Sequence, residues 1–122
     1  MAANLNVEVK DSAIDPDDTA RVIRVRNQDT DRPLYQVFLY LDGPDLPFVD
    51  SVTYHLHPTF PTPERRVTRS VTNPRCKLAI WAWGLFEVKV IIRDKTGREE
   101  MRVHGLEYDR QFSEKDVKFL PS

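Results

Sequence analysis

The sequence has little that could supply a covalent cross-link, a membrane anchor or a strong electric field. Its 122 residues include a single cysteine, Cys76, which excludes an internal disulfide. The 18 lysine and arginine residues nearly balance the 19 aspartate and glutamate residues, and the net charge of −1 gives no global attraction to nucleic acid or to an anionic membrane surface. The first residues show no positively charged start followed by an apolar run, and no stretch is long enough to span a bilayer. We therefore predict one soluble, cytoplasmic domain covering residues 1–122.

Hydrophobic residues recur with a period of two almost everywhere, as in β-strands. Residues 86–93 alternate apolar and charged positions, which is typical of a half-buried antiparallel strand. Residues 35–41 are apolar on both faces and predict a central strand, whereas residues 48–56 predict a one-sided strand. Residues 94–97 (DKTG) predict a hairpin loop leading into a strand over residues 99–104. Weaker patterns predict strands over residues 5–9, 20–27, 66–72 and 77–81, with a bulge at Gly105.

Helical patterning is missing as well. No apolar stripe of useful length recurs with a helical period, and nine prolines interrupt the chain. Seven or eight short strands with regular turns in a chain of this length predict an all-β fold, an immunoglobulin-like β-sandwich of about eight antiparallel strands.

Two aromatic turns are the most informative feature of the sequence. Residues 52–60 (VTYHLHPTF) and residues 81–86 (WAWGLF) each place aromatic side chains beside an alternating strand. Such a pair can build a narrow aromatic slot at one end of a sandwich. This pattern favours a ligand-binding module over an enzyme.

These motifs resemble the YEATS domain, and the prokaryotic branch of that family is the more similar one. The similarity covers roughly residues 34–110 and includes the spacing between the two aromatic blocks. The residues that carry it are 41–44 (LDGP), 48–54 (FVDSVTY), 55–61 (HLHPTFP), Pro74, 83–86 (WGLF) and 107–109 (EYD).

The resemblance implies an eight-stranded immunoglobulin-like sandwich that recognises acetylated or crotonylated lysine. By position, Phe60 and Trp83 are the ring walls, Thr59 offers a hydroxyl to the ligand amide, and His57 orients that hydroxyl. The backbone N–H of Trp83 receives the acyl carbonyl, and the flanking Ala82 and Gly84 complete the predicted ligand-binding set. The chemistry of a flat neutral amide is consistent with these roles, because such a ligand needs one hydrogen-bond acceptor, one donor and two ring faces. A charged lysine side chain would lose its solvation in the same slot and gain no counter-ion.

Three departures from the eukaryotic pattern modify this expectation. Ala82 stands where a glycine usually precedes the aromatic residue. It would strain or narrow the slot if the backbone there needed a positive φ or a close approach by the acyl group. Residues 29–33 lack the further phenylalanine of animal readers. A basic cluster disfavours a basic histone tail as the partner, and it favours another acylated-lysine peptide or protein. The cluster consists of Arg65, Arg66, Arg69, Arg75 and Lys77.

Four other interpretations compete with acyl-lysine recognition. The aromatic residues could be ordinary core or rim side chains, which makes the runner-up an interaction or structural domain with a vestigial slot. His55 and His57 could ligate a metal with His104, but no supporting carboxylate follows. Cys76 or Thr59 could act as a nucleophile with His57, but no activating acid lies nearby in sequence. The basic cluster could bind nucleic acid beside Trp81 and Trp83.

We therefore predict a recognition module that is not an enzyme, with no metal, no cofactor and no membrane or nucleic-acid partner. We expect a monomer or weak oligomer that forms part of a prokaryotic signalling or defence system.

Overall fold

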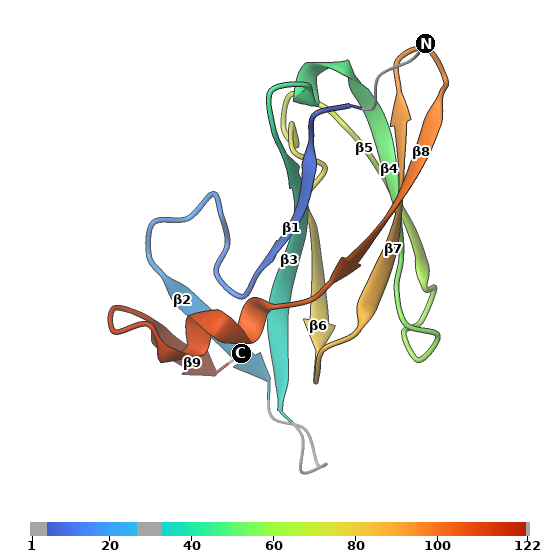
Figure 1. Ribbon diagram of the computed structural model, residues 1–122. Helices are drawn as coiled ribbons and strands as arrows, with labels where there is room; N and C mark the ends of the chain where they lie inside the picture. The colour runs from blue at the N-terminus through green and yellow to red at the C-terminus, as the bar shows by residue number, and fades with distance from the viewer. Residues whose placement is uncertain (1–4, 27–32, 122) are drawn as a thin grey trace.

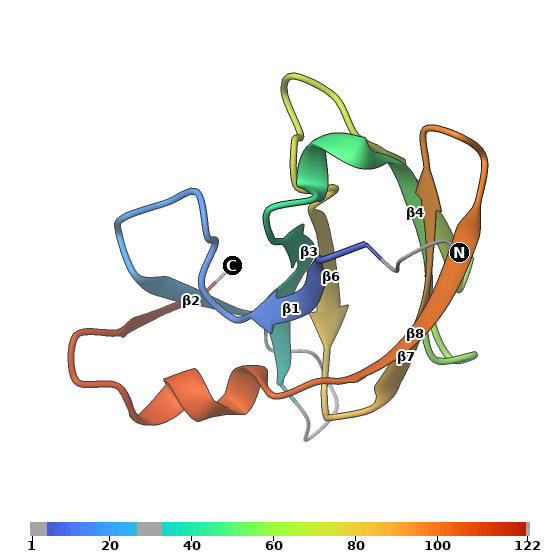
Figure 2. The same ribbon diagram turned by 45° about the horizontal axis from the view of Figure 1, so that its top comes forward.

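A computed structural model describes residues 5–26 and 33–121 of the chain. Their strands form two facing layers, seen as separate sheets in Figure 2. Two short 3₁₀ helices, η1 and η2, accompany the strands. In chain order the elements are β1 (Glu8–Ser12), β2 (Val22–Arg26), β3 (Leu34–Asp42), η1 (Leu46–Phe48), β4 (Val49–His55), β5 (Glu64–Thr68), β6 (Leu78–Ala82), β7 (Glu87–Asp94), β8 (Glu99–Gly105), η2 (Tyr108–Ser113) and β9 (Lys118–Pro121).

The first sheet is organised around β3, as expected from its two apolar faces (Figure 1). One edge of β3 pairs antiparallel with β6, and the other pairs with β1 near its end and with β2 near its start. β9 then adds to β2 in parallel, so that Val22 lies opposite Lys118. β6 consequently forms one border of this sheet.

The second sheet is a four-stranded antiparallel sheet in the order β5, β4, β7, β8. Tyr54 of β4 lies opposite Arg65 of β5 and Val90 of β7. The ladder shifts register between Val49 and Ser51, which is a bulge at the start of β4. Asp94 and Gly97 close the β7–β8 hairpin, where the predicted loop is confirmed: the Gly97 N–H donates to the Asp94 carbonyl at 3.0 Å.

The core is formed by the facing sides of the two sheets. Val88, Val90 and Ile92 of β7 are fully buried, as their alternation predicts, and they face residues of β3 such as Val37 and Leu39. Burying alternate residues of both sheets is the arrangement of an immunoglobulin-like sandwich, so the predicted fold class is confirmed.

Several local predictions need correction. The first strand begins at Glu8 instead of residue 5, because pairing with β3 starts where Glu8 meets Asp42. The strand predicted over residues 66–72 occupies Glu64–Thr68, so it begins two residues earlier and ends four residues earlier than predicted. Gly105 pairs in register with Glu87, so the predicted bulge there is wrong.

The last part of the chain also differs from expectation. β9 and η2 were not predicted, since the exposed residues of β9 show no alternation. No helix among residues 5–26 and 33–121 is long and apolar enough to cross a membrane.

The β8 strand presents its apolar side chains to solvent. Met101 and Val103 are exposed, whereas the alternating Arg102 and His104 point inward. Arg102 donates to the carbonyl of Leu5 at 2.6 Å and to that of Val7, and the His104 Nε2 lies 2.6 Å from the Asp11 Oδ1. These polar contacts join the open border of the second sheet to the N-terminal segment of the first.

Candidate functional site

The loop between β4 and β5, residues 57–63, is a closed structure. At its base the Leu56 N–H donates to the Pro63 carbonyl at 2.8 Å. Inside the loop the Phe60 N–H donates to the His57 carbonyl at 3.0 Å, which closes a tight turn through Thr59. The loop therefore presents Thr59 outward while it buries Phe60.

Arg65, the second residue of β5, stabilises the far side of the same loop. Its Nε donates to the Thr62 carbonyl at 2.6 Å, and its Nη2 donates to the Pro61 carbonyl at 2.7 Å. Thr62 has a positive φ of 49°, a conformation that is uncommon for a non-glycine residue. The two hydrogen bonds therefore hold a backbone turn that Thr62 alone would disfavour.

His57 and Thr59 form a preorganised polar pair. The His57 Nδ1 lies 2.8 Å from the Thr59 hydroxyl oxygen, and it also accepts the Thr59 backbone N–H at 3.3 Å. A nitrogen that accepts an N–H carries no proton, so the Thr59 hydroxyl must donate its own proton to Nδ1. The lone pairs of that hydroxyl oxygen are then directed outward, ready to accept an N–H from a ligand.

Phe60 and Trp83 stack directly on each other. Their ring centroids are 5.5 Å apart, and their planes differ by 24°. Phe60 is only 8% exposed, because Phe86 packs against its ring with 5.5 Å between centroids, whereas Trp83 is 38% exposed. The predicted ring walls therefore come together, with Trp83 on the outside.

The spacing of these rings leaves no room for a ligand between them. A flat acyl group sandwiched between two rings needs about 7 Å between the ring planes, twice a van der Waals contact of about 3.5 Å. The Phe60 and Trp83 rings are in mutual contact instead. Open space is found beside the rings.

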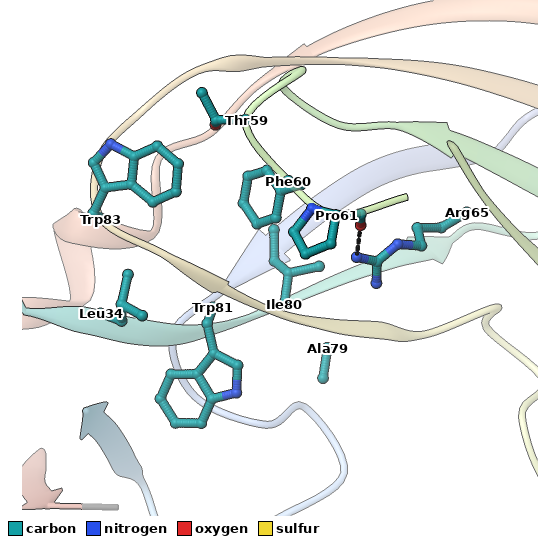
Figure 3. A pocket seen from close by; sticks show the side chains of 9 residues that line it. All are labelled: Leu34, Thr59, Phe60, Pro61, Arg65, Ala79, Ile80, Trp81 and Trp83. Atoms are coloured by element: carbon teal, nitrogen blue, oxygen red, sulfur yellow. Dashed lines mark hydrogen bonds between the residues drawn. The ribbon is translucent and has the colours of Figure 1, made fainter. Parts of the chain in front are cut away.

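That open space is a cavity of about 390 Å³ at the border of the sandwich, where β6 faces the β4–β5 loop (Figure 3). Its walls are mostly apolar, with one hydroxyl and one guanidinium. The lining residues are Leu34, Thr59, Phe60, Pro61, Arg65, Ala79, Ile80, Trp81 and Trp83.

The loop between β6 and β7, which carries Trp83 and Gly84, is held by the segment after β8. The Tyr108 hydroxyl donates to the Gly84 carbonyl at 3.1 Å, and the Leu106 N–H donates to the Phe86 carbonyl at 3.1 Å. Tyr108 is itself buried against Tyr35. The second aromatic loop therefore depends on a contact more than twenty residues away in the sequence.

The backbone at Ala82 does not need a positive φ, so this source of strain in the slot is absent. Ala82 ends β6 opposite Tyr35, and its side chain is fully buried in the core, away from the cavity. Among the described non-glycine residues, positive φ values occur only at Arg21, Thr62 and Cys76. Ala82 therefore has ordinary strand geometry, and a glycine is not required at this position by the backbone.

Comparisons with known proteins identify the family of this chain. The prokaryotic YEATS domain family matches residues 35–106, more than half of the chain. The chain belongs to the prokaryotic YEATS domain family. YEATS domains are recognition modules, and this membership confirms the interpretation that the chain is not an enzyme.

Individual relatives agree with this assignment. The YEATS domain is 39% identical over 75 residues to transcription initiation factor TFIID subunit 14 of Schizosaccharomyces pombe, a match that covers 60% of this chain and 29% of that protein. Its fold resembles the crystal structure of the yeast AF-9 homologue Yaf9, with a TM-score of 0.58, 16% identity, and coverage of 84% of this chain and 66% of that one.

Two further solved structures have the same fold. The Yaf9 YEATS domain recognising an H3K122suc peptide has a TM-score of 0.55 at 14% identity, and it covers 91% of this chain and 80% of that one. The Yaf9 YEATS domain bound to H3K27ac has a TM-score of 0.53 at 14% identity, with coverage of 88% and 77%.

The three histidines of this YEATS domain lie at different places with different partners. His57 faces Thr59, His104 faces Asp11, and the Nε2 of His55 lies 4.0 Å from a carboxylate oxygen of Glu64. Within residues 5–26 and 33–121, no group of three or more histidine, cysteine or acidic side chains could hold a metal ion. The competing metal interpretation therefore has no geometric support in this part of the chain.

Cys76 is a buried core residue in the turn before β6. Burial raises the pKa of its thiol to about 11, so the thiolate needed for nucleophilic attack is scarce at neutral pH. Its backbone carbonyl accepts a hydrogen bond from the Tyr54 hydroxyl at 2.8 Å, which links the two sheets. Cys76 therefore has a structural role.

Three residues of the basic cluster have separate partners within the protein. Lys77 forms ion pairs with Asp15 and Asp17 at 2.8 and 2.7 Å, and Arg69 donates to the Pro74 carbonyl at 3.1 Å. Arg65 is directed at its own loop. Each of these cations is bound to a carboxylate or carbonyl of the protein itself, whereas a phosphate-binding surface needs cations that are available to the nucleic acid.

Sequence patterns left two contributors to the site without a role. Phe86 belongs to the second aromatic block but has no predicted role in the site, yet its ring supports Phe60 and lies 6.0 Å from the His57 ring. Arg65 was grouped with surface cations, although it lines the cavity. Arg65 pairs with Tyr54, a buried residue of β4, and this pairing places it on the inward face of β5. The pairing cannot be read from the sequence, because it depends on the register between the two strands.

Proposed function

We propose that this YEATS domain recognises an acylated lysine side chain, acetyl or crotonyl, or another flat neutral amide. The observation that supports the proposal best is the 2.8 Å contact between the His57 Nδ1 and the Thr59 hydroxyl. It leaves an outward-facing acceptor at the mouth of an apolar cavity. An amide N–H from the ligand is the group such an acceptor suits.

The remaining ligand contacts follow from the positions around this acceptor. The backbone N–H of Trp83 would receive the acyl carbonyl, with the neighbouring Ala82 and Gly84 setting the backbone path. The acyl tail would lie against the rings of Phe60 and Trp83. Because Phe60 is packed on Phe86, we propose that Trp83 moves outward when a tail passes between the rings.

The comparisons support this chemistry through related domains. Yaf9 YEATS domains have been solved bound to H3K27ac and recognising H3K122suc, two acylated histone peptides. An unmodified lysine would bring a charged ammonium into an apolar cavity beside the Arg65 guanidinium, which is unfavourable.

We further propose a biological setting for the module. The basic cluster favours an acylated peptide or protein other than a basic histone tail. Residues 1–122 would act as one domain, monomeric or weakly oligomeric, in the cytoplasm and within a prokaryotic signalling or defence system. Neither a cofactor nor a nucleic-acid or membrane partner is needed for such recognition.

A titration tests the proposal directly. Peptides carrying acetyl-lysine, crotonyl-lysine or unmodified lysine are added up to millimolar concentrations, where a binding free energy of about −4 kcal/mol still registers. Amide chemical shifts and Trp fluorescence report binding, with Trp83→Ala as the control. We expect saturable binding of the acylated peptides only, lost in the variant.

The second candidate function is a protein-interaction or structural domain with a vestigial slot. The observation that favours it is the contact of Phe60 with Trp83, which closes the space between the rings. In that case all three peptides would leave the spectra unchanged at millimolar concentration. Such a result would reject the acyl-lysine proposal.

A further inference from the structure

The strand β8 forms one border of the second sheet, and within residues 5–26 and 33–121 its only strand partner is β7 (Figure 1). Two backbone hydrogen bonds fix how the pair is joined. The Leu106 N–H donates to the Phe86 carbonyl at 3.1 Å, and the Asp94 N–H donates to the Arg98 carbonyl at 2.9 Å. Hydrogen-bonded pairs alternate along an antiparallel ladder, and the register between these two ends is unbroken. The residues of β8 that direct their backbone groups at β7 are therefore Glu100, Arg102 and His104.

The other residues of β8 direct their backbone groups at the open border. They are Glu99, Met101, Val103 and Gly105. In the described part of the chain, no further backbone partner is found for their N–H and C=O groups. An unpaired strand border of this kind is a template for pairing with another chain.

The side chains at the centre of this open border are apolar. Met101 is 59% exposed, and Val103 is 57% exposed. Ile91 of β7 lies opposite Met101 and is half-buried, so the apolar surface continues across the outer face of the sheet. An added strand would therefore satisfy backbone groups and cover apolar side chains of the same two residues.

The strand β5, which is the other border of the same sheet, is built differently. The Leu56 N–H donates to the Pro63 carbonyl at 2.8 Å, and the Arg69 N–H donates to the Asp50 carbonyl at 2.9 Å, which fixes the alternation of the β4–β5 ladder. The residues that face away from β4 are Glu64, Arg66 and Thr68. Charged side chains on a border strand hinder pairing with another chain. The centre of β8 lacks this protection.

We propose that β8 pairs antiparallel with β8 of a second copy of this chain, so that Met101 lies opposite the partner's Val103. The two-fold axis of this dimer passes beside Arg102. Each free N–H and C=O group of the four border residues then has a partner on the other strand. The two four-stranded sheets become one continuous sheet.

This register suits a second copy of the chain. The apolar pair of Met101 with the partner's Val103 occurs twice by symmetry, and Glu99 meets the uncharged Gly105 of the partner subunit. Arg102 lies opposite its own copy on the inner face, but its charge is already paired with Glu100. A shift by two residues either puts Glu99 opposite Val103 or leaves the backbone of Glu99 without a partner in β8. The sequence of β8 is therefore complementary to itself in one register.

The pairing leaves the aromatic site accessible. The cavity lies beside the β4–β5 loop and β6, whereas β8 is the opposite border of the second sheet. The two cavities of a dimer would lie at opposite borders of the joined sheet, on the order of 30 Å apart at a strand spacing of about 4.8 Å. Dimerisation itself needs no ligand, so it does not depend on the proposed function.

The first test measures association of the unmodified protein. Sedimentation equilibrium from micromolar to millimolar concentration should show the average mass rising toward twice that of the chain. A mass that stays at that of one chain up to about 1 mM would overturn the proposal, even if β8 then pairs with a different protein.

The second test assigns the association to β8. Val103→Lys places a charge at the centre of the open border and should raise the dimer dissociation constant about tenfold or more. Thr68→Lys is the matched control, because it places the same charge at an exposed position of the β5 border. Circular dichroism establishes that both variants are folded. A dimer that survives Val103→Lys unchanged, or that is lost in Thr68→Lys, would reject β8 as the interface.

The third test separates strand pairing from a looser contact of apolar side chains. Amide hydrogen exchange followed by NMR should show that the N–H groups of Met101 and Val103 exchange rapidly in dilute solution and slowly in concentrated solution. The same groups should stay unprotected in Val103→Lys. Association without any gain in their protection would overturn the proposed strand pairing.

Discussion

The ring of Trp83 lies on the ring of Phe60 with 5.5 Å between centroids. It therefore covers a face of Phe60 that the proposed acyl ligand would occupy. Phe60 is held from behind by Phe86, whereas Trp83 is the partly exposed ring of the pair. Any ligand that passes between them must displace Trp83. Binding should therefore change the environment of one tryptophan and leave the other largely unaffected.

Substitutions at the two tryptophans should separate their roles. We expect an acylated peptide to shift the tryptophan emission of the wild-type domain and of Trp81→Phe, but not that of Trp83→Phe. The reason is that Trp83 is the ring that moves. Fluorescence titration of the three proteins provides the measurement. A ligand-dependent shift that persists in Trp83→Phe would contradict movement of this ring.

Thr59→Val should weaken binding by about tenfold with little change in stability. The substitution keeps the shape of the side chain but removes the acceptor for the ligand amide, a loss worth about 1–3 kcal/mol. Thr59 is exposed, so the fold should tolerate the change. Thr68→Val, at an exposed position of β5, is the control. If both variants bound like the wild type in NMR titrations, Thr59 would have no part in recognition.

Gly84→Ala should leave the fold intact and reduce affinity for acylated peptides. A Cβ placed on Gly84 meets no atom within 4 Å, so we expect a change in unfolding free energy within about 0.5 kcal/mol. The added methyl group would instead obstruct a ligand lying along the Trp83–Gly84 backbone. Gly105→Ala is a matched control, since its Cβ also meets nothing and lies outside the site. Equal affinities of the two variants would show that the ligand does not approach Gly84.

Asp94 should stabilise the β7–β8 hairpin only while it is ionised. The hydrogen bond donated by the Thr96 hydroxyl, and then those donated by the backbone N–H groups of Arg98 and Thr96, lower the pKa of its carboxyl below the usual 3.8 despite some desolvation. A carboxyl whose pKa falls on folding contributes stability above the unfolded pKa and loses that contribution as the pH falls through the folded pKa.

The corresponding variant is Asp94→Ala. We expect its melting temperature to lie below that of the wild type at pH 7, and the difference to narrow as the pH drops below 3.8. Thermal unfolding followed by circular dichroism over this range measures the effect. A difference that stayed constant with pH would argue against the ionised carboxylate as its source.

Cys76 should resist alkylation in the folded domain. With a pKa of about 11, roughly one thiol in a thousand is ionised at pH 8, and the side chain is buried. Iodoacetamide should modify it slowly under native conditions and rapidly in urea, as followed by mass spectrometry. Rapid modification of the native protein would contradict the buried, protonated state.

Local patterns predicted the strands whose burial is one-sided or complete. The alternation in residues 86–93 matches the buried Val88, Val90 and Ile92, and the doubly apolar residues 35–41 form the central β3. The pattern was misleading at the start of the chain. Val7 is buried although it precedes β1, because apolar contact and strand pairing need not begin at the same residue.

Long-range pairing hid other elements from sequence analysis. The residues of β9 are exposed and do not alternate between apolar and polar side chains. They form a strand only because they pair in parallel with the free edge of β2. The inward Arg102 and His104 of β8 likewise depend on carbonyl and carboxylate partners about ninety residues earlier. Periodicity cannot report such partners, since they are set by topology.

The sequence by itself determined the sandwich, the family and the two aromatic loops, because these depend on period-two burial, turn residues and motif spacing within short segments. The 2.8 Å pair of His57 with Thr59 also belongs to this local class. Only the tertiary structure decided that Phe60 and Trp83 touch, that Ala82 faces the core and that Arg65 enters the cavity. Those relations depend on strand register and on how two sheets meet, which no single segment encodes.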